Sequence, residues 1–305
     1  MAEAKPVTAD QKRDVAGLGI PAGACDCHVH VFEPALFPLA DGRAYTPGRA
    51  SLAMLEAHLD GLGIDRVVLV QASVYGTDNA CLLDALTRLR GRGRAVAVID
   101  PGATSAADLR ALWAAGVRGV RVNLESKGET RVEAALDAFA ATAGRVAGHG
   151  FAVQIYADMA LLPGLAETIA ASPSPVILDH FAGAKAERGP SQPGFAELID
   201  LLATGKVWVK LSALYRASAL AGSADLEPIA RAMIQARPDR MVWASDWPHT
   251  GGGKDRAARG PLTVEPFREI DSAAALRTLK SWCGDDAAFH RILAANAARL
   301  FDFPS

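Results

Sequence analysis

Eight short apolar segments, alternating with helical segments, constrain this chain more than any other feature of its sequence. Buried strands are expected at residues 24–30, 65–73, 94–100, 116–124, 151–158, 175–180, 206–212 and 240–246. Each segment is apolar enough to be buried on both faces, which is typical of parallel strands. Segments with a helical pattern, such as 51–61, 105–116 and 132–150, separate the strands. The alternation predicts an α/β fold built from eight βα units.

Eight consecutive βα units favour a closed (β/α)8 TIM barrel over an open sheet. An open sheet would be favoured by a glycine-rich phosphate loop after the first strand, and the sequence has none there. Residues 272–300 are expected to add C-terminal helices that cover the barrel. We therefore predict a single domain over residues 22–305, preceded by an N-terminal extension of residues 1–21.

The composition argues against several classes of protein. Lys and Arg number 32 and Asp and Glu number 34, and the basic residues are scattered, which disfavours a nucleic-acid surface. Residues 1–20 lack the apolar stretch of a secretory signal, and no run approaches the roughly 20 apolar residues of a membrane span. The four cysteines form no disulfide framework. We expect a cytoplasmic protein without nucleic-acid or membrane partners, and its oligomeric state stays open.

Four polar side chains stand at the ends of three predicted strands. His28 and His30 end the first strand, His180 ends the sixth and Asp246 ends the eighth. The carboxyl ends of barrel strands share one rim, where active sites lie. Alternate residues of a strand face the same side, so His28 and His30 are expected to point together into the barrel. A lone histidine is more often a hydrogen-bonded core residue, but these four together indicate a reaction centre.

The segments DCHVH (26–30), LDH (178–180) and SDWPH (245–249), in this order on a predicted barrel, resemble the amidohydrolase superfamily of the amidohydrolase-2 type. Within it, the chain is similar to the branch of 2-pyrone-4,6-dicarboxylate lactonases and related sugar-lactone hydrolases and isomerases. The resemblance covers about residues 22–300. It implies a hydrolase of carbohydrate or aromatic catabolism that opens an anionic lactone, either a pyrone dicarboxylate or a sugar-acid lactone. An aldarolactone isomerase, a zinc-dependent decarboxylase and a barrel that only binds an anion are the alternatives.

The strand ends depart from the usual metal centres of the superfamily. Those centres add a lysine or glutamate from strand four and a histidine from strand five, whereas these strands end in RVNL (121–124) and QIY (154–156). A bridged two-metal site is therefore not expected. One divalent ion, such as Zn²⁺, could still be held by His28, His30, His180 and Asp246. The lactonases that the chain resembles keep these four residues and work without metal, so we expect no cofactor.

In the mechanism that we predict, water opens the lactone ring with Asp246 as general base. His28, His30 and His180 would stabilise the negative charge that develops on the carbonyl oxygen. Asp246 would then return the proton to the departing ring oxygen.

The resemblance also implies a set of substrate contacts. Arg121 and Arg216, beyond strands four and seven, match positions that grip substrate carboxylates, for which a planar guanidinium is suited. Lys127 stands near the place of another arginine, and it supplies charge without the bidentate geometry. The other matching positions are Tyr45, Ser73, Tyr156 and His249. Taken singly, each of these residues has an ordinary structural explanation. Lys210 is expected at a helix-facing or solvent position, and His58 is expected to be a structural residue of a helix.

Overall fold

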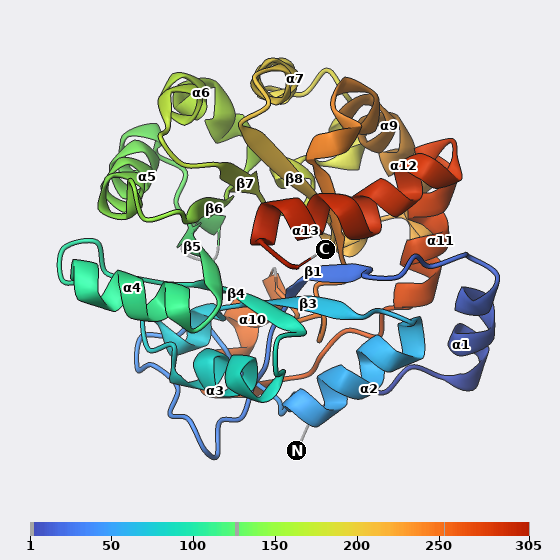
Figure 1. The fold of residues 1–305 in the computed structure, drawn as a ribbon, viewed down its shortest axis with the longest axis horizontal. Helices are drawn as coiled ribbons and strands as arrows, with labels where there is room; N and C mark the ends of the chain where they lie inside the picture. Colours follow the sequence, from blue (N-terminus) through green and yellow to red (C-terminus); the bar gives the residue numbers. More distant parts are fainter. Residues whose placement is uncertain (1–2, 126–127, 253, 305) are drawn as a thin grey trace.

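The computed structural model describes residues 3–125, 128–252 and 254–304 of the chain. Eight parallel strands form one sheet in the order β1, β3, β4, β5, β6, β7, β8, β9, and the sheet curls into a barrel (Figure 1). The strands are β1 (Cys25–Val29), β3 (Arg66–Val70), β4 (Gly93–Ala97), β5 (Val117–Asn123), β6 (Ala152–Tyr156), β7 (Val176–Leu178), β8 (Val207–Ser212) and β9 (Met241–Ala244). The predicted (β/α)8 barrel is confirmed, with one strand in each of the eight predicted segments.

The barrel closes where the last strand meets the first. Val29 forms a parallel bridge with Trp247, and the N–H of His30 donates to the carbonyl of Trp247 at 2.9 Å. The N–H of Asp246 donates to the carbonyl of His28 at 3.0 Å. The closure therefore brings the polar ends of the two strands together through their backbones.

Helices cover the outside of the barrel. The helices between the strands are α2 (Leu52–Leu62), α3 (Ala80–Arg88), α4 (Ala106–Ala114), α5 (Val132–Val146), α6 (Leu162–Ala171), α7 (Phe195–Ala203), α8 (Leu214–Ala217) and α9 (Glu227–Ala236). Local sequence sets their limits: α2, for example, begins after Ser51, whose hydroxyl accepts from the N–H of Met54, and ends at Gly63 with φ of 67°. The expected C-terminal helices are α11 (Ser272–Cys283), α12 (Asp286–His290) and α13 (Asn296–Phe301).

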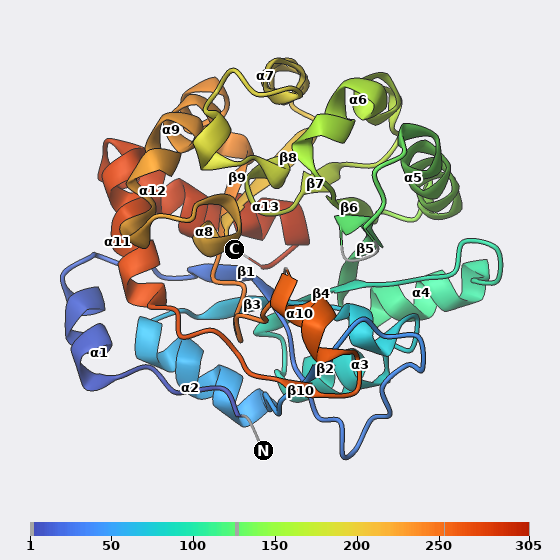
Figure 2. The same cartoon turned by 180° about the vertical axis from the view of Figure 1, so that it is seen from behind.

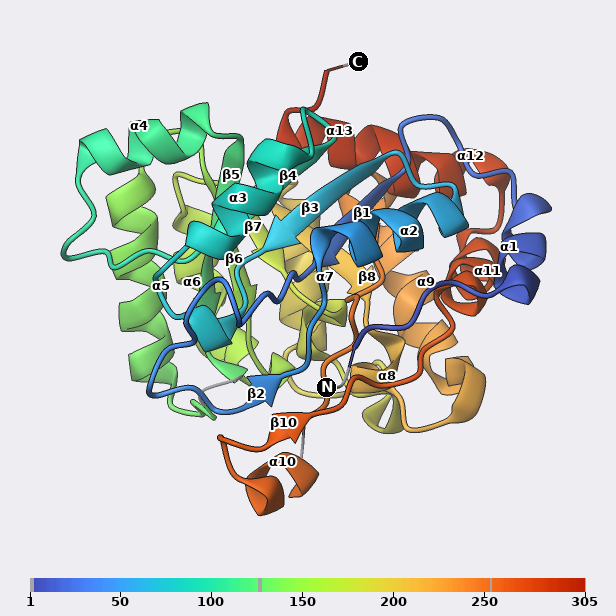
Figure 3. The same cartoon turned by 90° about the horizontal axis from the view of Figure 1, so that it is seen from below.

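The two ends of the barrel differ in chemistry. At one end, α13 and the C-terminal residues cross the opening (Figure 1), and Phe301 and Phe303 pack on an apolar layer that includes Cys25, Trp208 and Val242. The strands point toward the opposite end (Figure 3). There, α10 (Lys254–Arg259) and the short pair β2 (Thr46–Pro47) and β10 (Val264–Glu265) form the rim (Figure 2). The polar strand ends open on this rim.

The N-terminal extension packs against the side of the barrel. It contains α1 (Ala9–Ala16), which contacts α2 and α11. Before this helix, the N–H of Ala4 donates to the carbonyl of Arg49 at 3.1 Å. None of the helices in the described parts of the chain is both long and apolar enough to cross a bilayer.

Candidate active site

The structure brings the four residues at the strand ends into one buried group. The Nε2 atoms of His28, His30 and His180 lie 3.7, 3.7 and 3.9 Å from Oδ1 of Asp246. All four side chains are buried. A single carboxylate oxygen is therefore surrounded by three imidazole nitrogens, as the spacing of the strand ends predicts.

The backbone is strained where two of these side chains leave their strands. His180 has φ of 51° and Asp246 has φ of 64°, a region that residues other than glycine seldom occupy. Such conformations cost of order 1–3 kcal/mol each, and they persist where the surrounding structure holds them, often at functional sites. The strain coincides with the turn that follows each strand at the rim.

A hydrogen bond on the far side of the His30 ring decides which of its nitrogens carries the hydrogen. Nδ1 of His30 lies 2.7 Å from the carbonyl oxygen of Val70, which can only accept, so Nδ1 holds the hydrogen. Nδ1 of His180 lies 2.8 Å from Oγ of Ser212, a hydroxyl that can donate or accept, so this contact is compatible with either tautomer of His180. Burial lowers the pKa of both His30 and His180 to about 4. Near neutral pH, both rings are therefore neutral, and His30 presents an Nε2 lone pair to Asp246.

This arrangement narrows the roles predicted for the histidines. A neutral His30 with its hydrogen on Nδ1 cannot donate a hydrogen bond to an oxyanion from Nε2. It can accept one, from water for example, or bind a cation. Of the three imidazoles, this leaves His28 and His180 as candidate donors.

Asp246 is held as an anion by two neighbours that the sequence did not place there. Its Oδ2 accepts from the hydroxyl of Tyr215 at 2.6 Å and from Nε of Arg216 at 2.8 Å. Burial by itself raises the pKa of Asp246, but the Arg216 guanidinium and the surrounding imidazoles outweigh it and hold the pKa well below the usual range. Oδ1 therefore stays ionised and faces the three imidazoles.

A polar layer lies beneath these residues inside the barrel, and it overturns the position expected for Lys210. Lys210 is fully buried, because it lies on the same face of β8 as Trp208 and Ser212, which also face inward. Its Nζ lies 2.6 Å from Oε1 of Gln154 and 3.2 Å from Nδ1 of His28. The signal in the sequence was a charged residue in the middle of an otherwise apolar strand.

Asp179 completes this layer, and it precedes His180 in the LDH segment. Its Oδ1 lies 3.2 Å from Nδ1 of His28 and 3.4 Å from Nζ of Lys210. Its Oδ2 accepts from Nε2 of Gln154 at 2.8 Å. Burial raises the pKa of Asp179, but its neighbours, with the Lys210 ammonium group first among them, outweigh it and hold the pKa well below the usual range. The carboxylate is therefore a buried anion directly behind His28.

The four strand-end residues could hold one divalent cation. Nε2 of His28 is buried without a hydrogen-bond partner, and ligand atoms of His28, His30 and Asp246 all lie within 4.8 Å of one another. The Nδ1 hydrogen bond of His30 to a carbonyl is the kind that orients a metal-binding imidazole. Three imidazole nitrogens and one carboxylate oxygen suit Zn²⁺. The set of donors therefore fits a single ion.

The predicted substrate residues mostly line one small pocket above Asp246. It has a volume of about 30 Å³, and its walls include Tyr45, Ser73, Arg121, Tyr156 and Arg216 beside the strand-end residues. Buried Nε of Arg121 has no hydrogen-bond partner. The charged side chains that line the pocket are Arg121, Arg216 and Asp246, which are two cations and one anion. This balance favours an anionic ligand.

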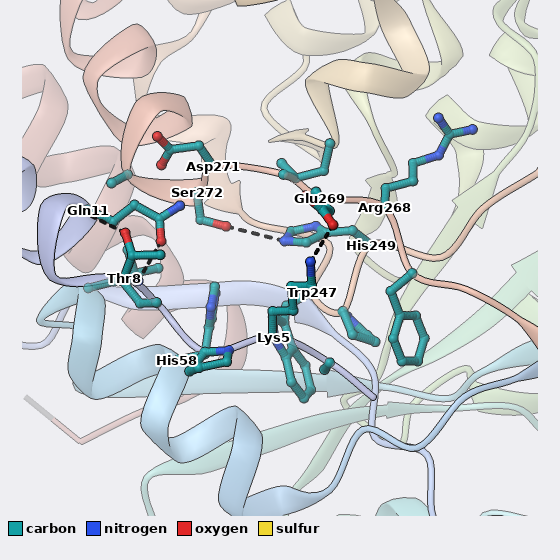
Figure 4. A pocket seen from close by; sticks show the side chains of 18 of the residues that line it. Lys5, Thr8, Gln11, His58, Trp247, His249, Arg268, Glu269, Asp271 and Ser272 are labelled. Carbon is teal, nitrogen blue, oxygen red and sulfur yellow. Dashed lines mark hydrogen bonds and ion pairs between the residues drawn. The ribbon is translucent and has the colours of Figure 1, made fainter. Parts of the chain in front are cut away.

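Two other predicted substrate residues are not in this pocket. His249 lines a separate cavity of about 330 Å³ beneath the N-terminal extension, together with His58, Trp247 and Ser272 (Figure 4). Its ring centroid lies 6.0 Å from that of Tyr215. Tyr215, which donates to Asp246, therefore connects His249 with the centre. Lys127 lies outside the described residues.

His58 gives a test of how burial affects stability. Burial lowers its pKa to about 3, so between about pH 6.5 and pH 3 the unfolded chain binds a proton at His58 that the folded protein does not. Stability is therefore lost as the pH falls through this window. In urea unfolding between pH 6 and pH 4, His58→Gln should reduce the slope of unfolding free energy against pH by about 1.4 kcal/mol per pH unit. His290→Gln, at a surface-exposed site, is the control, and an unchanged slope in His58→Gln would contradict the prediction.

Comparisons with known proteins agree with this architecture. The family model described as Amidohydrolase matches residues 25–303. The chain is 37% identical over 269 residues to a 2-pyrone-4,6-dicarboxylate hydrolase of Comamonas testosteroni, covering 85% of this chain and 87% of the relative. It is 35% identical over 288 residues to a 4-sulfomuconolactone hydrolase of Rhizobium radiobacter, covering 93% and 91%. A crystal structure of a putative 2-pyrone-4,6-dicarboxylic acid hydrolase from Pseudomonas putida superposes with a TM-score of 0.78 at 30% identity, covering 94% and 100%.

Proposed function

Because the chain belongs to the amidohydrolase family, we propose that it hydrolyses the ring ester of a carboxylated lactone. One observation carries the proposal: an ionised, buried Asp246 oxygen faces three imidazoles in a pocket with excess positive charge. The relatives named as hydrolases of a pyrone dicarboxylate and of a sulfomuconolactone support this class of substrate. Both names describe rings that carry an acidic group.

The attacking water is held between Oδ1 of Asp246 and the Nε2 lone pair of His30. It donates one hydrogen to the carboxylate and the other to the imidazole, so its oxygen is left free to attack. Asp246 takes a proton as the oxygen bonds to the carbonyl carbon of the lactone. When the tetrahedral intermediate collapses, the ring C–O bond breaks and Asp246 returns the proton to the departing oxygen. The products are one hydroxyl group and one carboxylic acid, which releases its proton to solvent and becomes a carboxylate.

The positive groups of the chain supply the charge stabilisation that this reaction needs, and we propose that it proceeds without a resident metal. Arg121 and Arg216 orient the carboxylates of the substrate, which lowers the entropic cost of reaching the transition state. If a divalent ion is bound, His28, His30, His180 and Asp246 would hold it, and it would acidify water and polarise the carbonyl. Elemental analysis of the active enzyme tests this point. Loss of activity with a chelator and its return with Zn²⁺ would contradict the metal-free proposal.

Turnover of carboxylated lactones in ¹⁸O-labelled water tests the reaction itself. Hydrolysis places one solvent oxygen in the new carboxylate of the product. An isomerase would move the lactone without taking up solvent oxygen, because a substrate hydroxyl would attack in place of water. A decarboxylase would release CO₂ and shorten the product by one carbon. Either of these two results would overturn the proposal, as would the absence of any turnover across pyrone, muconolactone and aldarolactone substrates.

Arg121→Met is expected to raise KM by about 10–100-fold and to change kcat by only a few-fold. The reason is that Arg121 lines the pocket with an unpartnered buried Nε but does not touch Asp246, so it contributes binding rather than proton transfer. Steady-state kinetics on the best lactone measure the split. Arg118→Met is the matched control on the same strand, because Arg118 stacks on Trp113 outside the pocket. A drop confined to kcat would contradict the binding role.

A further inference from the structure

A buried lysine behind His28 distinguishes this imidazole from the other two. We infer that Lys210 is a positioning residue: its ammonium group donates a hydrogen bond to Nδ1 of His28 and so places the ring hydrogen on Nε2, facing Asp246. His28 then has the opposite tautomer to His30. The kinetic consequences rest on the proposed lactone hydrolysis, whereas the tautomer can be tested without it.

Three polar atoms lie close together on the Nδ1 side of the His28 ring. Nδ1 of His28 lies 3.2 Å from Nζ of Lys210, a donor, and 3.2 Å from Oδ1 of Asp179, an acceptor. Nζ and Oδ1 lie 3.4 Å from each other. Nδ1 can either accept from Lys210 or donate to Asp179, and this choice fixes whether Nε2 carries a hydrogen.

The Lys210 ammonium group needs an acceptor for each of its N–H groups, and this favours the arrangement in which Nδ1 of His28 accepts from Lys210. Lys210 has three N–H groups, is fully buried, and has three acceptors at hand: Gln154 Oε1 at 2.6 Å, Asp179 Oδ1 at 3.4 Å and His28 Nδ1 at 3.2 Å. If Nδ1 donated instead, the third N–H of the lysine would face another N–H. A buried donor left without a partner costs about 1–3 kcal/mol, and more for a charged group.

Asp179 does not need the imidazole hydrogen. Its Oδ2 already accepts from Gln154 at 2.8 Å and lies 3.4 Å from the guanidinium of Arg121, while its Oδ1 faces Lys210. The carboxylate therefore keeps donors at both oxygens when Nδ1 of His28 is unprotonated.

The opposite side of the ring leads to the same tautomer. Oδ1 of Asp246 and Nε2 of His30 both present lone pairs to one small volume. A lone pair on Nε2 of His28 would add a third acceptor facing these two. A hydrogen on Nε2 of His28 supplies a donor to this group.

Two consequences follow for the site. His28 becomes an imidazole that donates to the oxyanion of the tetrahedral intermediate, while His30 accepts from the attacking water. An Nε2 that carries a hydrogen cannot bind a metal ion, so Lys210 also weakens the affinity of the four strand-end residues for Zn²⁺.

The direct test is ¹⁵N NMR of protein labelled in the histidine rings, because protonated and unprotonated ring nitrogens differ strongly in chemical shift. In the wild type near pH 7.5, His28 should show a protonated Nε2, whereas His30 should show a protonated Nδ1. In Lys210→Met, which keeps the length of the side chain, His28 should change to a protonated Nδ1 bonded to Asp179. Lys206→Met is the matched control, since Lys206 directly precedes the same strand and its exposed Nζ donates to the carbonyl of Ala170, away from the site. A protonated Nδ1 on His28 in the wild type would overturn the inference.

Two further measurements follow the same variants. Lys210→Met should lower kcat by about 100-fold and leave KM within a few-fold, because one oxyanion donor is lost and the substrate contacts remain. It should also bind Zn²⁺ at least tenfold more tightly than wild type in an equilibrium titration. Unchanged kcat, or weaker Zn²⁺ binding, would count against the inference. If the wild type converts no lactone, the proposed function fails, and the NMR result still decides the role of Lys210.

Should Lys210→Met fail to fold, Asp179→Asn provides the second variant. It removes the competing acceptor, so His28 should keep its hydrogen on Nε2. A protonated Nδ1 on His28 in this variant would contradict the inference as clearly as a protonated Nδ1 in the wild type would.

Discussion

Replacing Asp246 by asparagine is expected to lower kcat by about 10³-fold or more while KM changes by only a few-fold. Asparagine has nearly the same shape, and its side-chain oxygen can still accept from Tyr215 and Arg216, which bond to Oδ2 in the wild type. It cannot take a proton from water, however, and a positioned general base contributes roughly 10²–10⁴ in rate. Steady-state kinetics with the best lactone, together with binding of that lactone by calorimetry, would separate the two effects.

The matched control is Asp84→Asn, because Asp84 pairs with Arg88 on the surface of α3. It should leave both constants unchanged. Substantial turnover in Asp246→Asn would remove Asp246 as the base and with it the proposed mechanism. Loss of substrate binding without loss of kcat would instead make Asp246 a structural anchor for Arg216.

Arg216→Met should lower kcat/KM by about 10²–10³-fold. The reason is that the Arg216 guanidinium pairs first with Asp246 and then, once substrate is bound, with a carboxylate of the substrate. In the free enzyme it bonds to Oδ2 of Asp246 at 2.8 Å and to the carbonyl of Thr250 at 3.2 Å. The pocket has a volume of only about 30 Å³, enough for water but not for a lactone ring. Substrate entry therefore requires the wall of the pocket to move, and we expect Arg216, which is part of that wall, to turn its charge toward a carboxylate of the substrate.

The pH dependence separates these two roles of Arg216. In the wild type, Asp246 has a pKa well below its usual range, so it is ionised throughout the working range and contributes no acid limb there. Arg216→Met removes the positive charge that does most to keep Asp246 ionised. Burial then raises the pKa of Asp246. The acid limb of kcat/KM should move to higher pH, with activity lost as the pH falls. An acid limb at the wild-type position would contradict this account.

Arg216→Lys refines the experiment. Lysine keeps the positive charge beside Asp246, so the acid limb should stay close to that of the wild type. It lacks the planar fork of a guanidinium, so KM should still rise by about tenfold. Arg88→Met, on the surface of α3, controls for loss of an arginine elsewhere. If Arg216→Lys had the same KM and the same acid limb as the wild type, only the positive charge would matter at this position.

The barrel could be predicted from the sequence because its signals are local. Eight apolar segments of strand length each contain one observed strand, and helix ends such as Ser51 and Gly63 are visible as caps. The short pair β2 and β10 was not predicted, because two residues carry no periodicity. The N-terminal helix α1 was also missed, and its capping box at Thr8 and Gln11 was the available signal.

The sequence by itself determined which strand ends carry His28, His30, His180 and Asp246, since period-two alternation and barrel closure require them to meet at one rim. Only the tertiary structure decided what each of these groups can do. Which ring nitrogen carries a hydrogen depends on atoms from other strands, such as the carbonyl of Val70. The ionisation of Asp246 likewise depends on Arg216, and the environment of His28 depends on Lys210. Hydrogen bonds and charges act through space, so these properties arise only when distant segments of the chain come into contact.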